Sequence, residues 1–219
     1  MHVFYLHGFA SSAASTKAAY FKARLAEHGV SLHTPDFNQP DFSTLTVTRM
    51  VEQVGAEIAA LPPGRVVLIG SSMGAFVAVQ VAAKSRLKPA PDDASVDRLV
   101  LLAPALDFGR RRDFALGDRT HEEWKASGVT NVFHYGYGRL IPVHYDLYAD
   151  ACGYECENLT LDMPIQIFQG RHDTVVDPKT VEEWAKRRPN VELHLLEDDH
   201  QLGGSLDYMW RAIREFLKL

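Results

Sequence analysis

The chain has 219 residues, 46% of them hydrophobic and 23% charged, which suits one globular domain with a substantial core and is short for two. A net charge of -5 without any basic stripe argues against nucleic acid as a partner. No stretch approaches the roughly 20 apolar residues of a membrane span and no signal peptide follows Met1, so we predict a cytoplasmic protein that does not bind membranes.

Six short apolar segments are predicted to be β-strands. Several are almost continuous runs of branched residues, which is typical of parallel strands buried on both faces of a sheet. They are residues 2–6, 30–35, 65–70, 97–103, 164–169 and 191–197.

Helical patterns separate these strands along the chain. They run from Ser15 to His28, from Ser43 as N-cap, directly after Ser72, from Asp177 as N-cap with Pro178 as the first helical residue, and from about Ser205. The alternation predicts an α/β fold over residues 1–219, with a mostly parallel sheet of about six strands flanked by helices.

Residues 107–163 interrupt this alternation and are longer than a connection needs. A turn at residues 136–138 between two β-prone runs predicts a hairpin, and residues 144–152 look helical. We predict that the segment forms a cap or lid over the strand ends, placed before the strand that leads to the catalytic acid. Its two cysteines, Cys152 and Cys156, are expected to be reduced structural thiols, and no metal site is predicted.

The strongest local signal is the G-x-S-x-G pattern formed by Gly70, Ser72 and Gly74. It lies between an apolar strand and a helix-forming run, as a sharp strand–turn–helix requires. Such a nucleophile elbow exposes the serine hydroxyl at a helix N-terminus, where a developing oxyanion is favoured. Ser72 is therefore the predicted nucleophile. A structural turn is the weaker alternative.

The first predicted strand ends in His7, Gly8 and Phe9. A loop there can bend back and direct a backbone N–H at the nucleophile, so we predict an oxyanion hole made by the amides of Phe9 and Met73. His7 is a candidate base, but a loop-stabilising role is favoured because the catalytic histidine comes last in chain order in this fold.

Asp173 and His200 each follow a predicted strand, after the nucleophile and in the order Ser, Asp, His. Residues placed just after parallel strands meet at one edge of the sheet. We predict that Asp173 orients His200 as general base. Asp177 is the competing acid, but it is better explained as a helix N-cap.

Candidate substrate-binding residues in the insertion are Trp124, Tyr135, Tyr137 and His144. The aromatic rings could form an apolar acyl pocket, or could pack a small cap onto the main domain. His134 and His144 could line a pocket or lie on its surface.

The segments YLHGFASS, GSSMGA and GRHD, with the late DH, resemble the α/β-hydrolase superfamily across essentially the whole chain. The chain is most similar to the small bacterial YqiA-like esterases, although residues 107–163 form a longer insertion that resembles those of small acyl-thioesterases and glucuronide esterases. The resemblance implies carboxylic-ester hydrolysis without a metal or an organic cofactor.

These features predict a serine esterase that acts on an ester or thioester with a small to medium acyl group, as a monomer or homodimer. A thioesterase, amidase or carbon–carbon bond hydrolase with the same three residues is the alternative, because one fold supports many chemistries. A non-catalytic binding protein with this fold is the less favoured reading.

Overall fold

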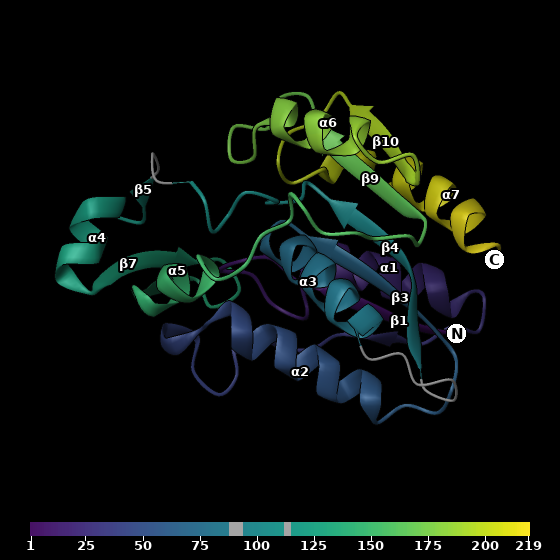
Figure 1. Cartoon of the computed structure of the whole chain (residues 1–219), viewed down its shortest axis with the longest axis horizontal. Coiled ribbons are helices and arrows are strands. Elements are labelled where there is room, and N and C mark those ends of the chain that lie inside the picture. The colour runs from purple at the N-terminus through teal and green to yellow at the C-terminus, as the bar shows by residue number, and fades with distance from the viewer. Residues whose placement is uncertain (88–93, 112–114) are drawn as a thin grey trace.

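The computed structural model describes residues 1–87, 94–111 and 115–219. Its centre is a six-stranded sheet in the order β10-β9-β4-β3-β1-β2, and every neighbouring pair in it is parallel (Figure 1). The strands are β1 (His2–Leu6), β2 (Leu32–His33), β3 (Arg65–Ser71), β4 (Ser95–Leu102), β9 (Ile165–Gly170) and β10 (Val191–Leu196). The predicted parallel α/β sheet is therefore confirmed.

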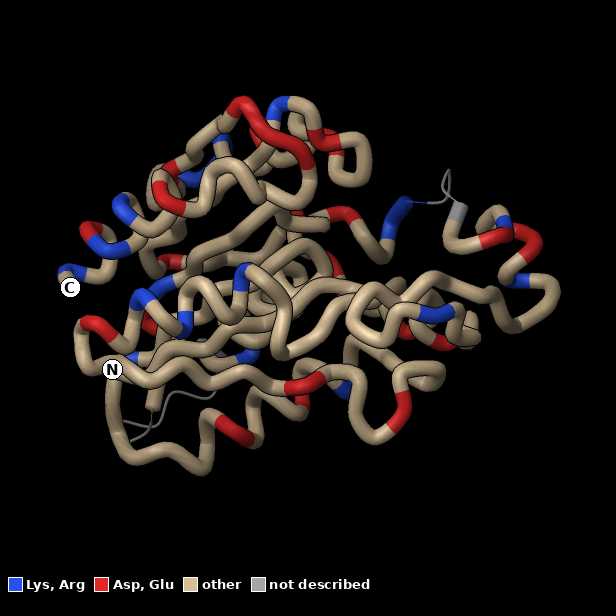
Figure 2. The backbone as a smooth tube through the Cα atoms, turned by 180° about the vertical axis from the view of Figure 1, so that it is seen from behind, with Lys and Arg blue, Asp and Glu red and all other residues tan. Residues whose placement is uncertain are grey.

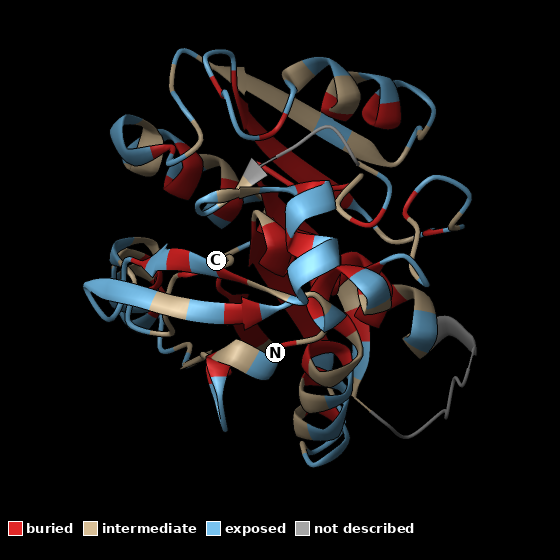
Figure 3. Cartoon of the chain, turned by 90° about the vertical axis from the view of Figure 1, so that its left-hand side faces the viewer, coloured by how far each residue is buried: buried red, intermediate tan, exposed pale blue. Residues whose placement is uncertain are grey.

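Helices cover both faces of this sheet, and a separate cluster of buried side chains lies between the sheet and the helices on each face. On one face pack α2 (Val47–Ala59), α3 (Met73–Leu87) and α6 (Pro178–Lys186). On the other pack α1 (Thr16–Ala26) and α7 (Leu206–Leu217). Every residue of β3 after Arg65 is buried, and successive strand residues face opposite sides, so both faces of β3 are covered. Figure 3 shows the sheet as a buried centre between exposed helix surfaces.

Side-chain caps fix where several helices begin. Ser15 accepts a hydrogen bond from the Ala18 amide at the start of α1, and Asp177 accepts one from the Lys179 amide at the start of α6. Asp177 is the N-cap predicted from the sequence, and Ser15 lies where the first helix was predicted to start. Each side chain satisfies an amide that has no partner inside its helix.

Two predicted boundaries were wrong. Ser43 does not begin α2, because Asp41 caps a short 3-10 turn at Phe42–Thr44, after which the chain is extended before Thr46 caps α2. The segment 30–35 contributes only the two residues of β2, an edge strand that pairs with β1 alone. The surrounding chain selects which residue caps α2 and how much of the segment 30–35 pairs with β1. A local sequence pattern does not show either of these.

The described residues of the segment 107–163 form a group of small elements beside the sheet (Figure 1). They are β5 (Ala115–Leu116), β6 (Arg119–Thr120), α4 (His121–Ser127), β7 (Val129–His134), β8 (Arg139–His144) and α5 (Asp146–Ala151). β7 and β8 form the predicted antiparallel hairpin, and α5 lies within the predicted helix. The Tyr135 amide donates to the Ala10 carbonyl at 2.9 Å, which joins the hairpin to the loop after β1.

Charged residues of both signs are distributed over the described chain (Figure 2). Among the described residues, none of the helices is long and apolar enough to cross a membrane.

Candidate active site

Ser72 lies at the sharp turn between β3 and α3. Its φ of 54° places it in the left-handed region, which is uncommon for a residue with a side chain and costs of the order of 1 kcal/mol or more. The Ser72 amide donates to the carbonyl of Leu102 at the end of β4, at 2.8 Å, and its carbonyl accepts from Ala75 and Ala105. These bonds hold the strained residue in place at the N-terminus of α3.

The two glycines of the motif permit this turn because backbone lies against both of them. A Cβ at Gly74 would lie 2.1 Å from the Leu6 carbonyl oxygen, and one at Gly70 would lie 2.5 Å from the Ala75 Cα. Both distances are shorter than real Cβ contacts. The close approach of backbone at these two positions therefore requires the glycines of the motif.

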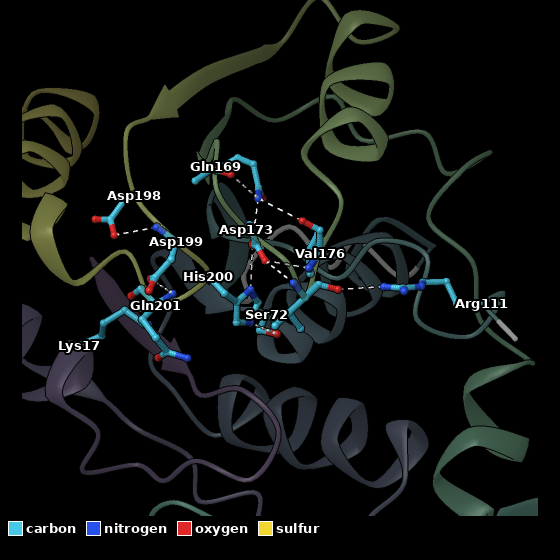
Figure 4. A network of polar contacts seen from close by, with 12 residues as sticks. Lys17, Ser72, Arg111, Gln169, Asp173, Val176, Asp198, Asp199, His200 and Gln201 are labelled. Atoms are coloured by element: carbon cyan, nitrogen blue, oxygen red, sulfur yellow. Dashed lines mark hydrogen bonds and ion pairs between the residues drawn. The ribbon is translucent and has the colours of Figure 1, made fainter. Parts of the chain in front are cut away.

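Three side chains from separate segments form a hydrogen-bonded chain at the carboxyl edge of the sheet (Figure 4). His200 Nε2 lies 3.1 Å from Ser72 Oγ, and His200 Nδ1 lies 2.8 Å from Asp173 Oδ2. The structure brings together the three residues singled out from the sequence, each just beyond its own strand. Asp177 instead caps α6.

The Asp173 carboxylate is buried and held at both oxygens. Oδ1 accepts the amides of Val175 and Val176, both at 2.8 Å, while Oδ2 accepts Gln169 Nε2 at 2.9 Å as well as His200. Burial alone would raise the pKa of Asp173, but the hydrogen bonds from His200, Val176 and Gln169 outweigh it and lower the pKa below its ordinary value. The group therefore stays ionised and can orient an imidazole.

The loop after β1 lies directly against the serine turn. A Cβ at Gly8 would lie 3.3 Å from Ser72 Cβ and 3.2 Å from the Ser71 carbonyl oxygen, so only glycine permits this approach without displacement. Phe9 and Met73 line the same cavity as Ser72. Their amides remain the predicted oxyanion donors.

A cavity of about 410 Å³ opens beside Ser72. Two polar groups at it are Asp107 and Arg111, whose Nη1 donates to the Val175 carbonyl at 2.9 Å. Most of its wall is apolar and comes from both the sheet side and the segment 107–163: Phe9, Met73, Phe108, Leu116, Leu147 and Val176. The volume is within the range of small-molecule sites.

The model of the uncharacterised protein family UPF0227 matches residues 2–218. The chain belongs to this family. The match confirms the resemblance to the YqiA-like group.

Several solved structures have the same fold as this UPF0227 protein. A putative hydrolase from Agrobacterium vitis is 25% identical, with a TM-score of 0.80 over 98% of this chain and 87% of that one. Est1E from Butyrivibrio proteoclasticus, with ferulic acid bound, is 19% identical, with a TM-score of 0.81 over 98% and 87%. Mouse α/β hydrolase domain-containing protein 10 is 18% identical, with a TM-score of 0.77 over 99% and 89%.

The UPF0227 chain thus has the α/β-hydrolase fold. No curated protein is significantly similar to it. Within residues 1–87, 94–111 and 115–219, no three His, Cys, Asp or Glu side chains are placed to share a metal ion.

The four substrate-binding candidates from the insertion do not line this cavity. Trp124 is fully buried, with Nε1 donating to the Val143 carbonyl, so it packs the insertion itself. Tyr135, Tyr137 and His144 are exposed on the β7–β8 hairpin. Their substrate contacts stay a prediction that the cavity does not support.

Sequence reasoning missed Gln169 and the cavity residues Phe108, Leu116 and Leu147 of the insertion. Leucines and phenylalanines occur throughout any core, so no local pattern marked these three. Gln169 did carry a signal, because it is one of two glutamines in the buried strand β9 and lies four positions before Asp173.

His7 is buried and has a structural position in this UPF0227 protein. Its Nε2 accepts the Phe37 amide at 3.0 Å, so the ring is neutral and Nδ1–H donates to the Gly8 carbonyl at 2.9 Å. It thereby fixes the loop that carries Phe9, as the loop-stabilising interpretation predicts. Burial lowers the pKa of His7, although the Gly8 carbonyl and Asp36 partly oppose this.

His134 on β7 is a second buried, neutral imidazole close to this loop. Its Nδ1 accepts the Tyr137 amide at 3.2 Å, which leaves Nε2–H to donate to Asn38 Oδ1 at 3.1 Å. Burial lowers the pKa of His134, and the nearby His7 lowers it further by a smaller amount. It neither lines the cavity nor lies on the surface.

Acidification is expected to destabilise the fold through these two histidines. Their folded-state pKa values lie below the unfolded value of about 6.5, so the unfolded chain binds more protons. The free energy of unfolding should be fully retained above about pH 6.5 and should fall as the pH drops below it. Each histidine contributes at most about 1.4 kcal/mol per pH unit.

Urea unfolding of the wild type and of His134→Gln between pH 7.5 and 5.5 measures this dependence. The variant should show a shallower slope, because one of the two groups is absent. His144→Gln, at an exposed position on the same hairpin, is the matched control and should keep the wild-type slope. Equal slopes for all three proteins would contradict the prediction.

Proposed function

We propose that the protein is a serine hydrolase that cleaves a carboxylic ester, or thioester, with a small to medium acyl group. The observation that carries the proposal is the continuous Ser72–His200–Asp173 contact chain, at 3.1 and 2.8 Å, beside an apolar cavity. The fold shared with a structure that holds ferulic acid, a carboxylic acid, supports it.

In the first step, Ser72 Oγ attacks the acyl carbonyl carbon while His200 Nε2 takes the hydroxyl proton. Asp173 keeps the proton on His200 Nδ1, which leaves Nε2 free to accept. The amides of Met73 and Phe9 stabilise the oxyanion, a contribution of about 3 kcal/mol for each such donor in related chemistry. His200 then protonates the leaving alkoxide or thiolate, and the acyl group remains on Ser72.

In the second step, His200 takes a proton from water as the oxygen attacks the acyl-enzyme. The tetrahedral intermediate that this attack forms then collapses and breaks the bond between Ser72 Oγ and the acyl carbon. His200 returns the proton to Ser72 Oγ, and the carboxylic acid is released. The apolar wall formed by Phe108, Leu116 and Leu147 suits the hydrocarbon part of the acyl group and excludes water around it.

Labelling with a fluorophosphonate probe, followed by peptide mapping, tests the proposal. We expect stoichiometric attachment at Ser72 and competition by p-nitrophenyl butyrate. A panel of acetyl, butyryl and octanoyl esters, with matched thioesters and anilides, then ranks the reactions by kcat/KM. Absence of labelling in the folded protein, with no turnover of any of these substrates, would overturn the proposal.

A further inference from the structure

Gln169 is a buried polar side chain next to the candidate active site that the mechanism above does not use. It lies near the end of β9, fully buried, and donates from Nε2 to Asp173 Oδ2 at 2.9 Å (Figure 4). The same carboxylate oxygen accepts His200 Nδ1 at 2.8 Å. Gln169 and His200 therefore share one acceptor atom.

An amide at this position is costly for the fold. Gln169 Oε1 is buried and has no hydrogen-bond partner within the described part of the chain. An unsatisfied buried acceptor destabilises a core, and an apolar side chain of similar volume would avoid this cost. Packing therefore explains a glutamine at this position poorly. The hydrogen bond from its amide nitrogen to Asp173 explains it better.

We propose that Gln169 is a positioning residue, which acts through Asp173 to set the orientation and charge of the His200 imidazole. This inference rests on the proposed function. With the Val175 and Val176 amides on Oδ1, the Gln169 amide on Oδ2 fixes the plane of the carboxylate. It also withdraws part of the negative charge from the oxygen that faces His200, so that the imidazolium is not over-stabilised before attack.

A purely structural role makes a different prediction. Gln169 Nε2 also lies 3.2 Å from the Gly170 carbonyl oxygen and 3.5 Å from that of Val176, so the side chain could simply brace the loop after β9. A brace affects stability and the amount of folded enzyme. It does not move the pH at which the folded enzyme gains activity, whereas an electrostatic influence on the Asp173–His200 pair does.

Gln169→Met, of similar length and without a donor, tests the role. We expect kcat to fall by about tenfold with little change in KM, because the imidazole is less well oriented. The acid limb of the kcat/KM profile should move to higher pH by about half a unit. Without the hydrogen bond from Gln169, Oδ2 carries more negative charge and stabilises the protonated imidazole of His200 more strongly. Gln169→Asn, which keeps an amide but is too short to span the distance, should behave in the same way.

Gln166→Met is the matched control. Gln166 is also buried on β9 and also has an unpartnered Oε1, but its Nε2 contacts Glu192 and His194 instead of the Asp173 carboxylate. Its pH profile should superimpose on that of the wild type. Thermal unfolding of all variants separates lost stability from altered catalysis.

Wild-type pH profiles in both Gln169 variants would overturn the positioning role and leave the proposed function standing. An equal shift in Gln166→Met, or failure of both Gln169 variants to fold, would assign Gln169 to the core and also overturn it. Absence of labelling and turnover in the wild type would overturn the proposed function, and the inference with it.

Discussion

Replacing Ser72 by alanine is expected to lower kcat for p-nitrophenyl butyrate by about 10⁵–10⁶-fold, the loss seen when a serine hydrolase is deprived of its nucleophile. The described residues offer no second hydroxyl in this chain of contacts, because His200 Nε2 is directed at Ser72 Oγ at 3.1 Å. Residual activity should reflect only binding and the oxyanion donors. Steady-state hydrolysis at high enzyme concentration measures the loss.

The fold of the Ser72→Ala variant should be unchanged. The backbone bonds that Ser72 donates to Leu102 and accepts from Ala75 do not involve the side chain, and alanine meets the same left-handed strain as serine. Circular dichroism and thermal unfolding should therefore match the wild type.

Ser71→Ala is the matched control for this prediction. Ser71 is buried at the end of β3 and its hydroxyl contacts Tyr5, so its loss should affect stability slightly and kcat by less than about twofold. A Ser72→Ala enzyme that retains activity within tenfold of the wild type would reject Ser72 as the nucleophile.

Most of the sheet could be predicted because its signals are local. A strand buried on both faces, such as β3, is an almost continuous apolar run, and a helix beginning at Ser15 or Asp177 needs a side-chain acceptor. The start of α2 could not be predicted, because Asp41, Ser43 and Thr46 can all cap and only the surrounding chain selects among them.

The convergence of Ser72, Asp173 and His200 followed from topology, since the carboxyl ends of parallel strands share one edge. The cavity wall could not be derived this way. It depends on how residues 107–163 pack, and that packing buries Trp124 and directs Leu116 and Leu147 toward Ser72, while the hairpin tyrosines remain outside. Aromatic composition alone does not distinguish a residue that packs the insertion from one that faces a substrate.

Replacing Asp173 by asparagine is expected to lower kcat by about 10⁴-fold without loss of the fold. The amides of Val175 and Val176 both donate to Oδ1 at 2.8 Å, so the oxygen of the new amide should occupy that site. Its NH₂ group then faces His200 Nδ1, which must accept instead of donate. The imidazole proton is forced onto Nε2, where it blocks acceptance from Ser72.

Asp177→Asn is the matched control, because asparagine caps a helix as well as aspartate does and the Lys179 amide keeps its acceptor. Its kcat should stay within about twofold of the wild type, and KM should change little in either variant. Steady-state kinetics of both variants and the wild type at pH 8 make the comparison at one common pH. If Asp177→Asn were inactive and Asp173→Asn active, the orienting acid would be the residue at the start of α6, and the contact at 2.8 Å between His200 and Asp173 would have no part in turnover.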